Sequence, residues 1–371
     1  MAVITELMQS YNQSDSADMW VAEGIHSITP VDTPLQLILP KLQVGEIKAE
    51  WIEDELTGLS SHLDATCAAT DTATIDVHAG DGADKFLDDV DTVIRVDQEY
   101  MLVTGVSTDK LTVTRGYAST VAAVHAANAV VHIVSQVEYE GANGKKAIAR
   151  ARTKPNNYVQ TFSRTVQVAG VQDAIKKLGG ITSEVDYQVL QAMRQLALEL
   201  EKTLIMGVAA QVGNGSSTYR TMGGLWAMVA TNRASDSGAV DTDALEADIK
   251  KIWDAGGVPR VIICCGAMAQ AISTLYASRI QADINTTIGG HGVTSIINPL
   301  GAGPIAIIPH RLIANGEYFM LDTEKVGLGY IRPFHMKPLA TDGDSEKRWI
   351  GGDYTLELLN EKAHSYRYGL N

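Results

Sequence analysis

The sequence predicts an α+β protein, and three observations lead to that class. Residues 181–206 form the longest uninterrupted helical pattern of the chain, and residues 60–134 contain short segments with strand periodicity. Residues 239–309 alternate helical patterns with apolar strand patterns, as in an α/β sandwich. Of the 371 residues 45% are hydrophobic, which is enough apolar material for two or three structural units.

The helix predicted over 181–206 is expected to serve as a spine for the rest of the chain. Ser183 suits the N-cap position and Gly207 marks the expected end. At ~1.5 Å per residue the helix spans about 35 to 40 Å, the width of a small domain. One face carries apolar side chains at steps of three and four residues, namely Val185, Val189, Met193, Leu196, Leu200 and Leu204.

Residues 1–45 are expected to form an N-terminal arm. Prolines at 30, 34 and 40 prevent a long helix and favour an extended chain with one short turn. Leu35 and Leu37 make this arm apolar. An arm that is both extended and apolar is expected to bind either the body of its own chain or a neighbour.

A charged β-arm is predicted from residues 46–59 and a returning strand at 136–154. The first flank is acidic and the second is basic. Because exposed pairs of opposite charge add little stability, these charges are expected to set the register of the two strands and the choice of partner. The alternative interpretation is that the acidic flank and the basic flank are both exposed to solvent and contact no partner. The candidate inter-subunit contacts are Glu50, Trp51, Glu53, Asp54, Glu55, Lys145, Lys146, Arg150, Arg152 and Lys154.

Residues 60–135 interrupt this arm and predict a small all-β insertion. Five segments with period-2 alternation are separated by turn residues such as Gly80-Asp81-Gly82. A loop at 81–91 is rich in aspartate, but it lacks the spacing of an EF-hand, so a solvated acidic loop is favoured over a Ca²⁺ site. The five segments are Thr74–Val77, Thr92–Val96, Tyr100–Val103, Leu111–Arg115 and Val130–Val134.

The remaining segments are assigned in order. Residues 155–175 predict a strand followed by a short helix that leads to the spine. A second amphipathic helix is expected at 241–253 with Thr242 as a possible N-cap, then a buried strand at 258–264, a helix at 267–278 and a strand at 304–309. Residues 325–371 are β-rich and are expected to return to the first body.

Composition excludes several classes of function. A formal net charge of −14 argues against sequence-specific binding of nucleic acid, and three cysteines form no disulfide framework. No signal peptide and no membrane-spanning apolar stretch is recognised. The common catalytic motifs are missing, so no catalytic residue, cofactor or metal is assigned. His310 with Asp322 is the nearest approach to a base and its orienting partner.

The order of these parts, together with several spaced motifs, resembles the major capsid proteins of tailed bacteriophages with the HK-ninety-seven-like fold. The resemblance covers roughly residues 25–371. Its motifs are Glu50-Trp51, Asn157–Arg164, Val168–Gln172, Ser183–Gln188, Leu200-Glu201, Arg332–Phe334, Tyr354–Glu357 and Asn360–His364.

The resemblance implies a domain plan. It comprises an N-terminal arm (1–45), an extended loop (46–59 and 136–154) with the β-rich insertion (60–135), a peripheral domain (155–238 and 325–371) that contains the spine helix, and an axial domain (239–324). In such shells the extended loop lies over the adjacent subunit, and the axial domains meet around the symmetry axes. An acidic flank opposite a basic one could join neighbouring copies.

The resemblance also implies a function. The chain is expected to assemble through homo-hexamers and homo-pentamers into an icosahedral head in the cytoplasm of the host bacterium, and to enclose double-stranded DNA in the virion without sequence-specific binding and without a membrane. Scaffold, portal and decoration proteins are the expected partners. An encapsulin-like shell for enzyme cargo remains an alternative, as does, from another class, an α/β enzyme with a β-barrel insert.

Overall fold

The computed structural model describes residues 32–67, 73–86, 91–138, 140–141, 151–175, 183–213, 218–276, 280–288, 291–301 and 303–370, and only the backbone of 280–288 and 291–294. The chain divides into two compact units. One contains residues 1–51 and 154–371 and is called the body; the other contains residues 52–153 and is called the insert unit.

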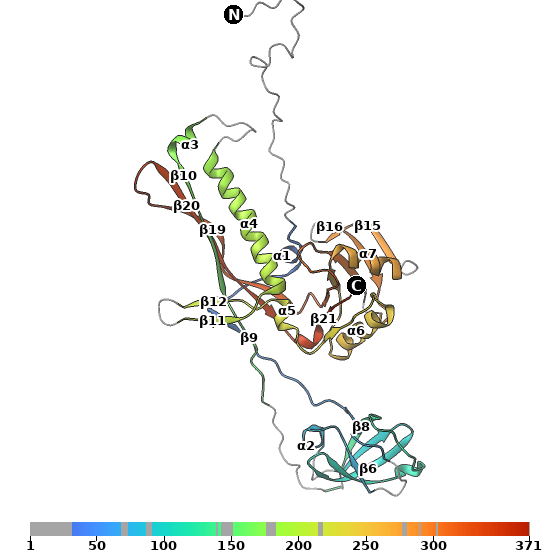
Figure 1. The fold of residues 1–371 in the computed structure, drawn as a ribbon. Coiled ribbons are helices and arrows are strands. Elements are labelled where there is room, and N and C mark those ends of the chain that lie inside the picture. The colour runs from blue at the N-terminus through green and yellow to red at the C-terminus, as the bar shows by residue number, and fades with distance from the viewer. Residues whose placement is uncertain are drawn as a thin grey trace, which may run out of the picture. The chain divides into compact units, whose positions relative to one another are not determined.

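The spine helix of the body has the N-cap and the last residue that the sequence predicts, and it begins at Glu184. Helix α4 (Glu184–Met206) begins after Ser183, whose Oγ accepts a hydrogen bond from the Asp186 backbone N–H at 3.3 Å, and it ends at Gly207. Its apolar face packs on strands β10 and β20, along which the helix runs in Figure 1. Met193 departs from the prediction because 37% of its surface is exposed.

A four-stranded sheet supports α4. The strand order is β1-β19-β20-β10, with β1 parallel to β19 and the other pairs antiparallel. Two short helices flank it, and α1 lies in the predicted arm with Pro34 as its first residue. The bounds are α1 Pro34–Ile38, β1 Lys41–Gln43, β10 Gln160–Ala169, α3 Gly170–Ala174, β19 Val326–Leu339 and β20 Ser345–Leu358.

A seven-stranded mixed sheet forms the second part of the body. Its order is β13-β21-β18-β14-β17-β16-β15, and Figure 1 shows helices α6 and α7 beside it. Asp241, not Thr242, is the N-cap residue of α6, and the sequence did not predict strands β15 and β16. The bounds are β13 Arg233–Ser235, α6 Thr242–Asp254, β14 Val261–Cys264, α7 Gly266–Leu275, β15 Ile280–Ile288, β16 His291–Ile297, β17 Pro304–Pro309, β18 Tyr318–Leu321 and β21 Ser365–Tyr368.

Two hydrophobic cores lie on opposite faces of this sheet. Because side chains alternate along a strand, Val261 and Ile263 of β14 join the core that includes α4, whereas Ile262 and Cys264 join the core under α6 and α7. The remaining elements of the body are β2 Lys48–Glu50, β9 Asn156–Tyr158, β11 Ala210–Val212, β12 Tyr219–Thr221, α5 Leu225–Met228 and the short 3₁₀ helix Glu361–Ala363.

The insert unit contains a six-stranded sheet that closes on itself. The strand order is β3-β8-β5-β6-β7-β4. The two outer strands meet because Asp64 N–H donates to the Asp76 carbonyl and His78 N–H to the His62 carbonyl, each at 2.9 Å. Closure leaves no free edge of the kind that pairs with other chains. We call this closed sheet the barrel.

The barrel contains the five predicted strands and one, β3, that the sequence analysis missed. Twelve buried apolar residues fill it, among them Phe86, Ile94 and Met101. Of the aspartates predicted at 81–91, Asp81 pairs with Lys85 at 2.8 Å, and Asp88 and Asp89 lie outside the described residues. The bounds are β3 Ser60–His62, β4 Thr74–Asp76, α2 Asp81–Lys85, β5 Asp91–Val96, β6 Glu99–Ser107, β7 Lys110–Thr114, the 3₁₀ turn Tyr117–Ser119 and β8 Val130–Val137.

Candidate assembly surfaces

The base of the predicted β-arm is formed by β2 and β9. Lys48 lies opposite Tyr158, so the first part of the outgoing strand pairs with residues 156–158, just beyond the returning strand predicted at 136–154. Trp51 is buried, and its backbone N–H donates to the Pro155 carbonyl at 3.2 Å. Within the insert unit, Glu53 and Thr153 exchange two backbone hydrogen bonds of 3.0 Å. The arm is therefore an antiparallel ribbon where it is described.

The acidic and basic flanks of this arm meet within one chain. Asp54 Oδ2 lies 3.4 Å from Arg152 Nε, and both side chains are more than half exposed. Glu50 pairs with Lys48 on its own strand, and that contact lowers the pKa of the Glu50 carboxyl, with a smaller effect from Lys154. Glu55 is exposed, and Lys145, Lys146 and Arg150 lie outside the described residues. An intrachain pairing thus accounts for Asp54 and Arg152 without a second copy.

Apolar side chains that the sequence analysis did not select are exposed along the same arm. The exposed fractions are 62% for Ile52, 91% for Leu56 and 72% for Leu59, and Ile47 in the body is 50% exposed. Their position on either side of the acidic run Glu53–Glu55 was the available signal. Covering apolar surface is favourable by ~25 cal/mol per Å², so the exposed side chains of Ile52, Leu56 and Leu59 in the insert unit are suited to contact with another protein chain.

A buried carboxylate fastens the N-terminal arm to the spine helix. Glu201 of α4 is fully buried and accepts hydrogen bonds from the backbone N–H groups of Leu35, at 2.7 Å, and Gln36, at 3.2 Å. These are first-turn donors of α1, which have no partner within that helix. His310 Nε2 is a third partner of Glu201, at 2.9 Å. The predicted apolar arm therefore binds its own body at residues 35–36.

The same contacts show why His310 is not a catalytic base. Its Nδ1 accepts a hydrogen bond from the Leu312 backbone N–H at 3.1 Å, so Nε2 carries the proton that it donates to Glu201. The Asp322 carboxylate accepts a hydrogen bond from the Val258 backbone N–H, and the Asp322 backbone N–H donates to Nδ1 of His364, so these contacts of Asp322 do not involve His310. Burial also raises the pKa of the Cys264 thiol to about 12, which leaves it without nucleophilic thiolate.

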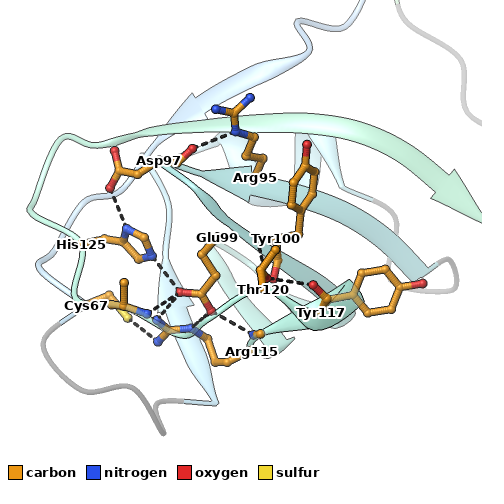
Figure 2. Close-up of polar contacts among 11 residues, drawn as sticks. Cys67, Arg95, Asp97, Glu99, Tyr100, Arg115, Tyr117, Thr120 and His125 are labelled. Carbon is orange, nitrogen blue, oxygen red and sulfur yellow. Dashed lines mark hydrogen bonds and ion pairs between the residues drawn. The ribbon is translucent and has the colours of Figure 1, made fainter.

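The barrel contains a second buried carboxylate, Glu99 at the start of β6. Arg115 donates to both of its oxygens, at 2.7 and 2.8 Å, and His125 Nε2 lies at 3.0 Å (Figure 2). The backbone N–H groups of Gly116 and Ala123 donate as well, at 3.0 and 2.9 Å. Burial by itself raises the pKa of Glu99, but these donors outweigh burial and lower the pKa to about 2.

His125 connects this carboxylate to a second one. Its Nδ1 lies 2.7 Å from Asp97 Oδ2, and its ring is almost fully buried (Figure 2). Each ring nitrogen thus lies within hydrogen-bond distance of a carboxylate, so His125 links Asp97 to Glu99. Cys67 pairs with His125 through two backbone hydrogen bonds. The cluster holds residues 115–125 against β6, and no periodic pattern in the sequence predicted it.

Among the residues that the structure describes, no group of three or more histidine, cysteine and carboxylate side chains is arranged to hold a metal ion. In the same part of the chain, no helix has the length and hydropathy needed to cross a membrane.

Comparison with known proteins identifies the family. A family model described as SU10 major capsid protein matches residues 7–370. The chain belongs to the SU10 major capsid protein family. No curated protein matches it significantly. Membership assigns a structural role in a viral capsid, and the family and fold are not those of enzymes.

Solved structures with the same fold are distant in sequence. The SrpI encapsulin of Synechococcus elongatus PCC 7942 is 11% identical, with 99% of this chain and 96% of that chain covered and a TM-score of 0.52. Mycobacterium phage Bobi is 11% identical, with 99% of both chains covered and a TM-score of 0.51. The capsid of a native GTA particle is 8% identical, with 99% and 100% covered and a TM-score of 0.50. These matches confirm the HK-ninety-seven-like phage capsid fold expected from the sequence.

Proposed function

We propose that this SU10-family protein assembles through hexamers and pentamers into the icosahedral head of a tailed bacteriophage, which encloses double-stranded DNA. The family match over residues 7–370 is the observation that carries the proposal. Copies of a capsid protein associate into a shell and become part of the virion, and we infer that assembly takes place in the cytoplasm of the host bacterium. We infer scaffold and portal proteins as partners in this pathway, with decoration proteins as an optional addition to the shell.

The domain plan is part of the same proposal. We assign 155–238 and 325–371 to the peripheral domain, 239–324 to the axial domain, 46–59 and 136–154 to the extended loop and 1–45 to the N-terminal arm. The burial of residues 35–36 against Glu201 supports an arm that is fixed to its own body at that point. The exposure of Leu56 and Leu59 supports an extended loop that a neighbouring subunit covers.

The role of the charged residues on the arm is also proposed. Because Asp54 and Arg152 pair within the chain, we assign recognition between copies to the exposed apolar side chains, with the flanking charges selecting the register. The formal net charge of −14 supports an acidic inner surface of the shell that encloses DNA without binding it tightly. DNA that stays bound to the shell in low salt and is released in high salt would contradict this role of the acidic surface.

An encapsulin-like cargo shell is the competing function within the fold. The encapsulin match at 11% identity carries the fold alone, whereas the family match concerns a major capsid protein. Nucleic acid within purified particles favours the phage head, and protein cargo without nucleic acid favours the encapsulin-like shell.

Expression with and without a scaffold protein tests the proposal. We expect rings or closed particles of several megadaltons by size-exclusion chromatography and negative-stain electron microscopy. A chain that remains a monomer or dimer under every assembly condition, with its fold intact by circular dichroism, would contradict the proposed function.

A further inference from the structure

One surface of the barrel differs in charge from the rest of it. Residues 60–138 contain twelve aspartates and glutamates against four lysines and arginines, a formal net charge of −8 out of −14 for the whole chain. Within them, residues 116–137 contain no charged residue other than histidine. The barrel is therefore acidic with one long uncharged segment.

The first part of that segment is a loop with exposed apolar side chains. Val121 is 83% exposed, Val124 is 59% exposed and Tyr117 is 37% exposed. The alanines at 118, 123, 126 and 127 are exposed as well. We call residues 116–127 the apolar loop. An apolar surface on a module whose own core is complete is available to another chain.

The apolar loop is held in one conformation. Glu99 accepts hydrogen bonds from the backbone N–H groups of the loop's first residue, Gly116, and of Ala123 within the loop. Thr120 Oγ1 accepts from the Tyr100 N–H at 3.2 Å and donates to the Tyr117 carbonyl at 2.8 Å (Figure 2). A loop that is already ordered loses little conformational entropy when it docks, which is the property of a pre-organised contact surface.

The other surfaces of the barrel are poorly suited to a contact between copies. Strand addition is excluded because β3 and β4 close the sheet. Two barrels of net charge −8 repel each other, so the uncharged apolar loop is the surface on which two of them can approach at least cost. The occupant that this charge distribution favours is the same loop of a second copy.

We propose that the apolar loop forms a homotypic contact between the barrels of two subunits in the assembled shell, with Val121 facing its own counterpart across a local two-fold axis. The inference rests on the proposed function. A contact made by so few side chains is weak by itself, and it gains strength from repetition around a closed shell. It therefore stabilises the particle and does not dimerise the free chain.

Cross-linking within assembled particles tests the contact. The described native cysteines Cys67, Cys264 and Cys265 are buried, so V121C introduces the accessible thiol of the barrel. We expect a short bismaleimide to convert V121C subunits in particles to covalent dimers on a denaturing gel. The control is S107C, an exposed position at the last residue of β6, whereas the apolar loop is bonded to Glu99 and Tyr100 at the first two residues of that strand; S107C should stay monomeric.

A second variant pair measures the energetic effect. V121D with V124D should assemble into particles of normal size that release their contents at a temperature lower by several degrees, whereas S107D should match the wild type. Val121 and Val124 are too exposed for these changes to unfold the barrel.

The outcomes separate the two proposals. If wild-type chain forms no particles, the proposed function and this inference both fail. If particles form but V121C remains monomeric, couples to a different protein, or the double aspartate variant is as stable as the wild type, the homotypic contact alone is overturned.

Discussion

The barrel and the body each depend on a buried glutamate, but the two glutamates connect different kinds of structure. Glu99 binds groups that lie between Arg115 and His125, within 26 residues of it in the chain. Glu201 binds Leu35 and His310, which are 166 and 109 residues away. The barrel is thus a locally connected module with its own core, whereas the body is assembled from distant segments. A local module can be inserted into a capsid fold without changing the connections of the body.

The largest effect that tests this comparison is expected from Glu99→Ala. Removing the carboxylate leaves the Arg115 guanidinium and His125 buried without their shared partner, which costs about 3 to 5 kcal/mol. Hydrogen exchange measured by mass spectrometry on the full chain should show loss of protection in residues 91–137 and none in α4. The control is Asp64→Ala, at an exposed position of the same barrel. Loss of protection in both units would show that the barrel is not independent.

Glu201→Ala is expected to have the next largest effect. This variant should destabilise the body and leave the barrel unchanged. The buried backbone N–H of Leu35 loses its acceptor, which costs about 1 to 3 kcal/mol, and the Gln36 N–H, which is only partly buried, adds less. Thermal unfolding should shift for the body while the barrel retains its exchange protection. Glu199→Ala is the matched control, because Glu199 is half exposed on the same helix and contacts Arg164 at 3.6 Å. An equal effect of the two variants would contradict the role of Glu201.

Acidification should affect the body before the barrel. Burial lowers the pKa of His364 to about 4 from its usual 6.5, so the body binds fewer protons than its unfolded chain and loses stability as pH falls from 6.5 toward 4. Glu99 has its pKa lowered from 4.5 to about 2, so its contribution is lost only as pH falls from 4.5 toward 2. Each shift corresponds to roughly 3 kcal/mol.

Hydrogen exchange at pH 7, 5 and 3.5, corrected for the intrinsic rate, checks this order. His364→Asn should flatten the response of the body between pH 6.5 and 4 and leave that of the barrel unchanged. A barrel that loses protection first would contradict the assignment.

The smallest effect on stability is expected from the exposed pair Asp54–Arg152. Either D54R or R152D should change the free energy of unfolding by less than about 1 kcal/mol, because solvent screens both charges. The double variant D54R/R152D restores the pair with its charges exchanged. Normal particle assembly by the double variant supports an intrachain role, and failure of assembly despite a normal fold supports a contact with a neighbouring copy.

The local features of the sequence were sufficient for much of the fold. Helix α4 was predicted with its cap because a 3.6-residue apolar period and a capping serine are properties of one continuous segment. Five strands of the barrel were predicted for the same reason, since alternation is visible within four to six residues. The residues that pair with β2 lie just beyond the predicted returning strand, because strand register depends on distant residues.

The candidate surfaces were predicted only in part. Sequence patterns singled out the charged arm, but they did not show that Asp54 and Arg152 satisfy each other within the chain. The exposure of Leu56 and Val121 was not foreseen, because an apolar residue in a sequence is assigned to a core unless the fold shows otherwise.

The sequence by itself determined the class of the protein, the spine helix, the strand content of the insertion and the uncharged segment at 116–137. Only the tertiary structure decided that the insertion closes into a barrel, that Glu99 and Glu201 are buried, and that Val121 is exposed. The reason is physical. Periodicity and charge are properties of neighbouring residues, whereas closure, burial and the satisfaction of a buried carboxylate depend on groups that folding brings together from distant parts of the chain.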